Sequence, residues 1–191
     1  SEHKLKEDDE VIVTEETSNK SELVFFSNKC NAYKLRTYDV PESKVAAMGE
    51  YVPSLLGLEP DEKIIYAVVT KDYSGNMLFT FANGKMAKVE LMNYQTKSNR
   101  KKLIKAYSDK SPLVAALYIT QDTELVLISS AGRHLLFNTA AISSKTTKDT
   151  QGVAVFTLKK GQRLMTVRPY AEGEFAKPYR YRTKNLPSTG A

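Results

Sequence analysis

The chain has 191 residues, 41% of them hydrophobic, which suits one large β domain or a short array of repeats. Its net charge is +6, but residues 71–191 carry twenty basic and eight acidic residues, an excess typical of a surface that binds a polyanion. A basic surface that serves only solubility is the alternative. The single cysteine excludes an internal disulfide. Together with a polar, acidic start and no apolar run near the roughly 18 residues of a membrane span, it favours a cytoplasmic protein without membrane contact.

Three stretches of the chain repeat one pattern, an apolar strand, a short polar turn and a second strand. They are residues 22–37, 76–91 and 124–139. Their turns align at Cys30, Gly84 and Gly132, with spacings of 54 and 48 residues. Hairpins repeated at about 50 residues are typical of a propeller-like array. We therefore predict an all-β fold of about three to four hairpin blades over residues 1–169. Cysteine at the first turn further predicts a backbone without positive φ there.

The segments between the hairpins also repeat. A polar turn leads into an apolar strand at residues 61–65 and again at 161–165, and residues 7–13 echo both, so residue 1 is expected to lie inside a repeat. Gly49 and Gly152 each precede apolar residues three and six positions later, which predicts a bend that returns the chain to its own blade. No window sustains a helical period.

The hairpin pattern ends after Pro169. Residues 170–191 are predicted to form a tail that either packs on a sheet edge, as a cap on the last repeat, or trails free. Residues 186–190 match the Leu-Pro-x-Thr-Gly signal for cell-wall anchoring, but no apolar span follows and no signal peptide precedes them, so we interpret the match as coincidence.

Taken together, the repeats resemble the C-terminal domain of the A subunit of bacterial type IIA topoisomerases, DNA gyrase and topoisomerase IV. The resemblance covers about residues 5–170 and is most specific at residues 26–42, 80–89 and 149–155, the first of which ends in a Tyr-x-Val-Pro-Glu turn. It implies a β-pinwheel, a propeller-like disc whose blades are formed partly by strands exchanged between neighbours. It also implies DNA bent around a basic outer rim. The Gly-rich basic heptapeptide of gyrase is not in this sequence, but it would fall before residue 1. Gyrase and topoisomerase IV therefore both stay open, and the short set of repeats favours topoisomerase IV.

The resemblance implies a non-catalytic module of a larger enzyme. The cleavage tyrosine of the family belongs to a separate N-terminal domain, so none of the eleven tyrosines here is expected to be catalytic. ATP and Mg²⁺ would act on other domains of the whole enzyme. The implied partners are double-stranded DNA at the nucleoid, the N-terminal cleavage domain of the same chain and the ATPase B subunit.

Basic residues are the candidates for contact with DNA, because binding of phosphates by cations releases condensed counterions. The densest group follows the second hairpin, a smaller group occupies the matching loop one repeat later, and three more basic residues lie on the hairpins. The predicted contacts are Lys97, Arg100, Lys101, Lys102, Lys105, Lys145, Lys148, Lys34, Lys88 and Arg133. A rim of this kind would recognise the DNA backbone and its bendability rather than base edges.

Other functions find less support. His3 and His134 lie far apart without a Cys/His cluster, and Asp8, Asp9 and Glu10 lack the spacing of a calcium loop. No acid, base or nucleophile pattern indicates a hydrolase. The main alternative is a propeller-like scaffold for protein interactions without a nucleic-acid role.

Overall fold

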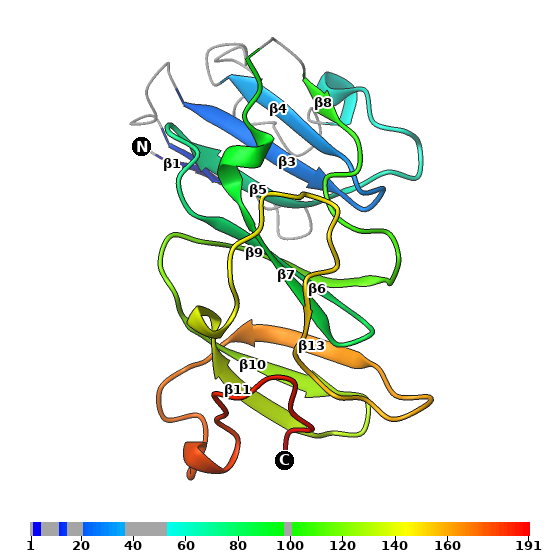
Figure 1. Cartoon of the computed structure of the whole chain (residues 1–191). Helices are drawn as coiled ribbons and strands as arrows, with labels where there is room; N and C mark the ends of the chain where they lie inside the picture. Colours follow the sequence, from blue (N-terminus) through cyan, green and yellow to red (C-terminus); the bar gives the residue numbers. More distant parts are fainter. Residues whose placement is uncertain (1, 5–11, 15–20, 37–52, 98–100) are drawn as a thin grey trace. The chain divides into compact units, whose positions relative to one another are not determined.

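A computed structural model describes residues 2–4, 12–14, 21–36, 53–97 and 101–191. Nearly all of its regular structure is antiparallel β-sheet, which confirms the predicted all-β class (Figure 1). Among these residues no helix is long and apolar enough to cross a membrane. The chain divides into two compact units. The first comprises residues 1–74 and 92–106, and the second residues 75–91 and 107–191.

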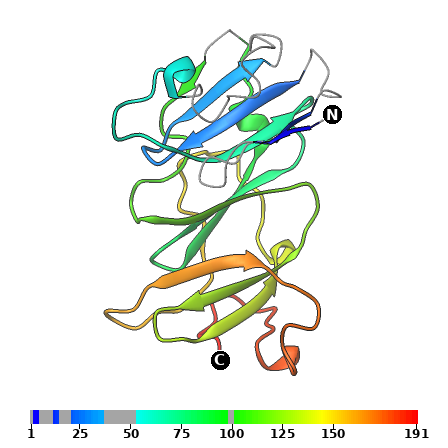
Figure 2. The same cartoon turned by 180° about the vertical axis from the view of Figure 1, so that it is seen from behind.

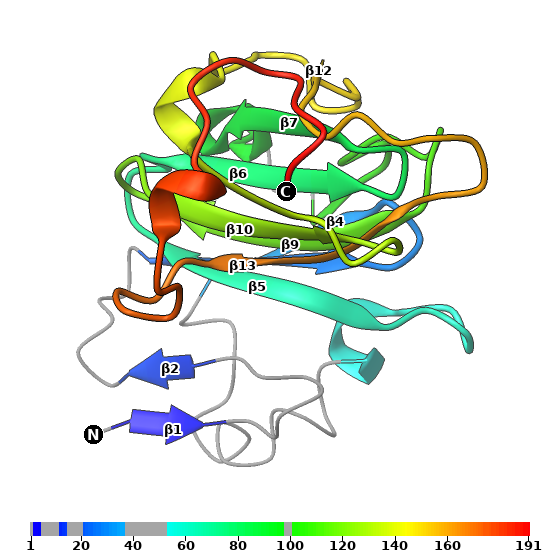
Figure 3. The same ribbon diagram turned by 90° about the horizontal axis from the view of Figure 1, so that it is seen from below.

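The first unit is built on a four-stranded sheet with the strand order β5-β3-β4-β8, called the first sheet. Its strands are β3 (Glu22–Ser27), β4 (Ala32–Arg36), β5 (Ile64–Thr70) and β8 (Lys102–Leu103). A separate two-stranded ribbon pairs β1 (Glu2–Lys4) with β2 (Ile12–Thr14) (Figure 3). A short helical turn at residues 53–56 brings Leu55 and Leu56 against a core that includes Phe25 and Tyr33.

The second unit holds two sheets. The second sheet has the order β12-β7-β6-β9, and the third has the order β11-β10-β13. Figure 2 shows β13 beside β10. The strands are β6 (Asn76–Phe81), β7 (Lys85–Glu90), β9 (Leu113–Ile119), β10 (Glu124–Ser129), β11 (His134–Asn138), β12 (Val153–Ala154) and β13 (Leu164–Pro169). Among the described residues of both units lie also three 3₁₀ turns, η4 (Leu91–Tyr94), η5 (Thr139–Ala141) and η6 (Pro178–Arg180). One apolar core, with Leu78, Leu127 and Phe137 among its buried members, joins the two sheets.

All three hairpins close with the same turn. The third loop residue has a positive φ in each, 59° at Cys30, 85° at Gly84 and 77° at Gly132. The prediction for Cys30 was therefore wrong. A three-residue hairpin loop needs a left-handed residue at this point, and this need outweighs the cost of a side chain there, about 1 to 2 kcal/mol.

The outer strand of each four-stranded sheet comes from the segment that follows the next hairpin. β8 follows the second hairpin but pairs with β4 (Figure 1), and β12 follows the third hairpin but pairs with β7 (Figure 3). The prediction that Gly152 returns the chain to its own blade was wrong, because β12 joins the preceding hairpin. A Cβ at Gly152, where φ is 75°, would lie 1.9 Å from the Met86 carbonyl oxygen, so only glycine permits this approach. Gly49 lies outside the described residues.

The tail of residues 170–191 belongs to the second unit and packs on the open edge of the third sheet. The Leu136 amide donates to the Tyr181 carbonyl (2.9 Å), and His134 and Ala191 exchange two backbone hydrogen bonds of 2.8 Å each. Arg182 donates twice to the Glu124 carboxylate. Of the two alternatives for the tail, edge packing is the one observed. Leu186, the first residue of the anchoring-signal match, packs against the core of this unit.

Candidate nucleic-acid interface

The outer edge of the first sheet is formed by residues 101–106, called the first edge segment. The Lys34 amide donates to the Lys101 carbonyl (2.7 Å), and the Ala106 amide donates to the Cys30 carbonyl (2.8 Å). Between these two bonds Leu103 is buried, whereas Lys101, Lys102, Ile104 and Lys105 are exposed. Side chains of successive strand residues point to opposite faces, so Lys102 projects on the face opposite to that of the buried Leu103.

Residues 145–156, called the second edge segment, form the outer edge of the second sheet. The Lys145 amide donates to the Lys88 carbonyl (2.7 Å), and the Val155 amide donates to the Gly84 carbonyl (2.9 Å). Lys145 is exposed and Lys148 partly so. Both segments thus meet the hairpin four residues after its left-handed turn residue, at Lys34 or at Lys88. Lys101 directly precedes the antiparallel strand β8, whereas Lys145 forms an isolated parallel bridge with Val89, well before β12. Lys101 and Lys145 thus contact matching hairpin lysines but do not hold equivalent places in the two edge segments, and the match of the two basic loops stays a prediction.

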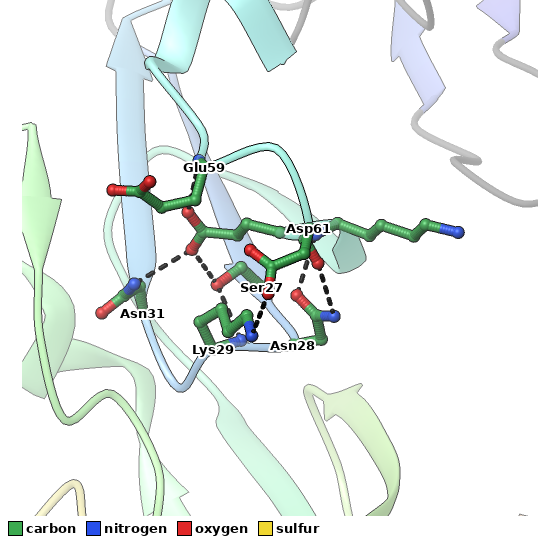
Figure 4. A network of polar contacts seen from close by, with 8 residues as sticks. Ser27, Asn28, Lys29, Asn31, Glu59 and Asp61 are labelled. Carbon is green, nitrogen blue, oxygen red and sulfur yellow. Dashed lines mark hydrogen bonds and ion pairs between the residues drawn. The ribbon is translucent and has the colours of Figure 1, made fainter.

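Acidic neighbours distinguish some of the basic residues from others. Lys29 pairs with Asp61 (2.6 Å; Figure 4), and Arg168 and Arg182 pair with glutamates at 2.7 Å. Within the described part of the chain, no ion pair joins an acidic residue to any of four exposed lysines: Lys97, Lys101, Lys102 and Lys105. Their positive charge is therefore uncompensated by described neighbours. Arg100, the other member of this group, lies outside the described residues.

The structure corrects the prediction for the two hairpin lysines Lys34 and Lys88, each only 6% exposed. The Lys88 ammonium donates to an Asp122 oxygen (2.8 Å) and to two backbone carbonyls at 3.2 Å. The Lys34 ammonium donates to the Thr96 hydroxyl, and burial lowers the pKa of Lys34. Both side chains tie a hairpin to loops of the following repeat, so neither ammonium faces solvent at a rim.

Arg133 is exposed, yet its guanidinium is engaged. It donates to the backbone carbonyls of Thr189 (2.9 Å) and Gly190 (2.7 Å) and so holds the tail against the third sheet. No sequence pattern indicated this role, because the tail returns to the hairpin from more than fifty residues away.

A buried carboxylate that sequence reasoning missed fixes the turn of the first hairpin. Glu62, 5% exposed, accepts hydrogen bonds from Ser27, from Asn31 (3.0 Å) and from the Tyr33 hydroxyl (2.8 Å). Figure 4 shows Ser27 and Asn31 converging on this network. Burial raises the pKa of Glu62, but the hydrogen bonds together outweigh it and lower the pKa to about 2. Burial, aided by the bond to Glu62, raises the pKa of Tyr33 to about 12.

The repeat pattern of the sequence could have pointed to the role of Glu62. Gln162 precedes β13 as Glu62 precedes β5, and each accepts a hydrogen bond from the backbone amide three residues earlier, at 3.1 and 3.2 Å. The described residues hold no cluster of three or more His, Cys, Asp or Glu side chains suited to a metal. The sequence candidates Asp8, Asp9 and Glu10 lie outside them.

Comparison with known proteins places this chain in a family. A family model described as the DNA gyrase C-terminal domain, a β-propeller, matches residues 21–71 and 123–170, just over half of the chain. The chain belongs to the DNA gyrase C-terminal domain family. The matched regions contain the first and third hairpins and the strands β5 and β13 that follow them.

Individual relatives agree with this assignment. The DNA gyrase A protein of Borreliella burgdorferi is 25% identical over 173 residues, which are 90% of this chain and 21% of that protein. Its counterpart in Helicobacter pylori is 34% identical over 112 residues, 56% of this chain and 13% of that protein. The chain therefore spans only 13% to 21% of the length of these relatives. The solved C-terminal domain of a DNA topoisomerase IV shares the fold, with a TM-score of 0.68 and 24% identity over 85% of this chain and 49% of that one.

Proposed function

We propose that this domain binds double-stranded DNA without sequence specificity and bends or wraps it along the outer edges of its sheets. The observation that carries the proposal is the first edge segment, where three exposed lysines lie within five residues and form no ion pair with a described acid. Such cations gain binding free energy by releasing counterions from the DNA backbone. Membership of the gyrase C-terminal domain family supports the same proposal.

The chemistry of the edge favours contact with phosphates over reading of bases. A lysine ammonium is a compact point charge on a flexible stem, and base-specific contacts of the bidentate kind are usually made by Arg, Asn or Gln. On the first edge segment all three cations are lysines, Lys101, Lys102 and Lys105. Binding should therefore depend little on base sequence and strongly on salt.

The parent protein, on this proposal, is the gyrase-A-type chain of a type II DNA topoisomerase in the cytoplasm, at the nucleoid. This domain would present DNA to the enzyme without taking part in bond cleavage. Cleavage would fall to an N-terminal domain of the same chain, and ATP and Mg²⁺ would act there and on the ATPase partner protein. The support is that the relatives are gyrase A proteins of which this chain spans about a fifth.

The test is fluorescence anisotropy of the 191-residue chain with two labelled duplexes of about 40 base pairs and unrelated sequence, at low salt. The proposal predicts binding to both, with dissociation constants within a few-fold of each other. A folded sample that binds neither duplex would refute DNA binding and favour the protein-interaction scaffold. Binding to only one of them would refute the lack of specificity.

A further inference from the structure

Ile104 is the most exposed large aliphatic side chain among the described residues, at 65%. A single exposed aliphatic residue is ordinary on a protein surface. The position of Ile104 is not ordinary, because it lies between Lys102 and Lys105 on the first edge segment, where the positive charge is densest. An apolar tip in the middle of a phosphate-binding surface would meet the DNA together with the lysines.

The backbone on both sides of Ile104 is firmly held. Before it, Leu103 is 5% exposed and pairs with Ala32 in the sheet register. After it, fully buried Ala106 donates its amide to Cys30 (2.8 Å) and accepts a hydrogen bond from the Tyr94 hydroxyl (2.6 Å). Only Ile104 and Lys105 project between these anchors, so they form a short, fixed tip.

The conformation of the tip also stands out. Lys105 has a φ of 51°, a left-handed conformation that costs a non-glycine residue about 1 to 2 kcal/mol. Strain of this kind persists where the surrounding structure imposes it, and it gathers at functional sites. The side chain of isoleucine is branched at Cβ and therefore stiff at its first torsion angle. A stiff apolar group on an anchored backbone is suited to insertion.

We propose that Ile104 is a wedge that enters the minor groove and partly unstacks one base step while the neighbouring lysines hold the phosphates. This rests on the proposed DNA binding and adds a mechanism for bending. Proteins that bend DNA insert apolar side chains between base steps and kink the duplex by about 20 to 90°. Pyrimidine–purine steps such as TA unstack most easily, so the wedge should favour them although it reads no base edge.

The second edge segment has no such tip. Its β12 strand runs directly along β7, and Val153, its one exposed large apolar residue, is 38% exposed within a paired strand. Gly152 holds that strand close to the Met86 carbonyl. Of the two edge segments, only the first can insert a side chain, which predicts one kink there and smooth phosphate contact at the second.

The test uses the whole chain and a duplex of about 20 base pairs with one central TA step between stiff G·C-rich flanks. 2-Aminopurine beside that step reports unstacking, and dyes at the two ends report bending by energy transfer. The natural chain should raise the 2-aminopurine fluorescence and shorten the end-to-end distance. Ile104→Ala should lose both signals and keep the salt dependence of binding. Met92→Ala, which removes another exposed apolar side chain of the same unit (52% exposed), should behave as the natural chain does.

The outcomes separate the wedge from the function on which it rests. If the natural chain binds DNA with a steep salt dependence but neither unstacks nor bends it, or if Ile104→Ala retains both signals, the wedge is wrong and DNA binding stands. If neither protein binds the duplex at low salt, the proposed function itself fails. Equal signals on a duplex with a central GG step would overturn the preference for flexible steps.

Discussion

The first and second sheets are built on one backbone plan and differ in the chemistry placed on it. In both, a hairpin with a left-handed turn residue pairs with its outer strand one to three residues after that residue, and the edge segment also contacts the buried lysine four residues after it. In the first sheet the turn residue is Cys30 and the outer strand carries an exposed Ile104 among lysines. In the second sheet the turn residue is Gly84 and the outer strand is pressed against β7 at Gly152.

The difference shows that the repeat determines backbone pairing, whereas local contacts determine which side chains are tolerated and which are exposed. A Cβ at Gly84 would lie 2.3 Å from the Phe156 carbonyl oxygen of the second edge segment. At the matching position of the first sheet a cysteine side chain is present. The first edge segment must therefore pass its turn differently, and that path also leaves Ile104 and Lys105 projecting.

The largest expected effect is at the two turns. Gly84→Ala should destabilise the second unit by about 4 kcal/mol, because it adds left-handed strain and a clash that displaces hydrogen-bonded backbone. Cys30→Ala should lower the free energy of unfolding by less than about 1 kcal/mol, because position 30 already holds a side chain at a positive φ. Urea unfolding of both variants measures the two losses. Equal losses of stability would contradict this, because they would mean that the two edge segments pass their turns in the same way.

An effect of intermediate size is the pH dependence of stability, which should differ between the two sheets. The pKa of Glu62 is about 2, below its ordinary 4.5, so its stabilisation is complete above about pH 4.5 and is lost as pH falls toward 2. Linkage gives a loss of about 2 kcal/mol between pH 6 and pH 3. The matching residue before β9 is Ser111, which carries no charge. Urea unfolding of Glu62→Gln should therefore show that much less pH dependence than the natural chain, whereas Ser111→Ala should leave the pH dependence unchanged.

The smallest effect compares the buried lysines. Lys88→Met should cost about 1.5 kcal/mol, since it removes charge-assisted bonds, although Asp122 keeps 42% of its side chain exposed and stays solvated. Lys34→Met should cost less, because its ammonium bonds one described hydroxyl and burial already lowers its pKa. Thermal unfolding of both variants would rank them. A larger loss for Lys34 would show that the Thr96 contact and the Tyr73 ring, 5.9 Å away, matter more than the ion pair.

The sequence predicted the hairpins and the all-β class, because the apolar strands and turn residues recur at nearly constant spacing. It could not predict that Lys34 and Lys88 are buried. Both faces of these strands are covered in the fold, so strand alternation no longer separates inside from outside. The sequence-based prediction also paired the strand after Gly152 with the wrong hairpin. Whether this strand pairs with the third or the second hairpin depends on contacts between residues distant in sequence. The sequence could not predict the projecting tip at Ile104 either, because the tip depends on the positive φ of Lys105, which no residue pattern indicated.

The central claim, that lysines of the first edge segment hold DNA phosphates, is tested most directly by the salt dependence of binding. Lys101→Gln/Lys102→Gln should be compared with Lys63→Gln/Lys71→Gln, which removes the same charge from exposed lysines of the same unit. Each lost phosphate contact lowers the slope of log K against log salt by about 0.9, so the edge variant should lose about 1.8 and the control almost nothing. Equal slopes for the two double variants would contradict the account.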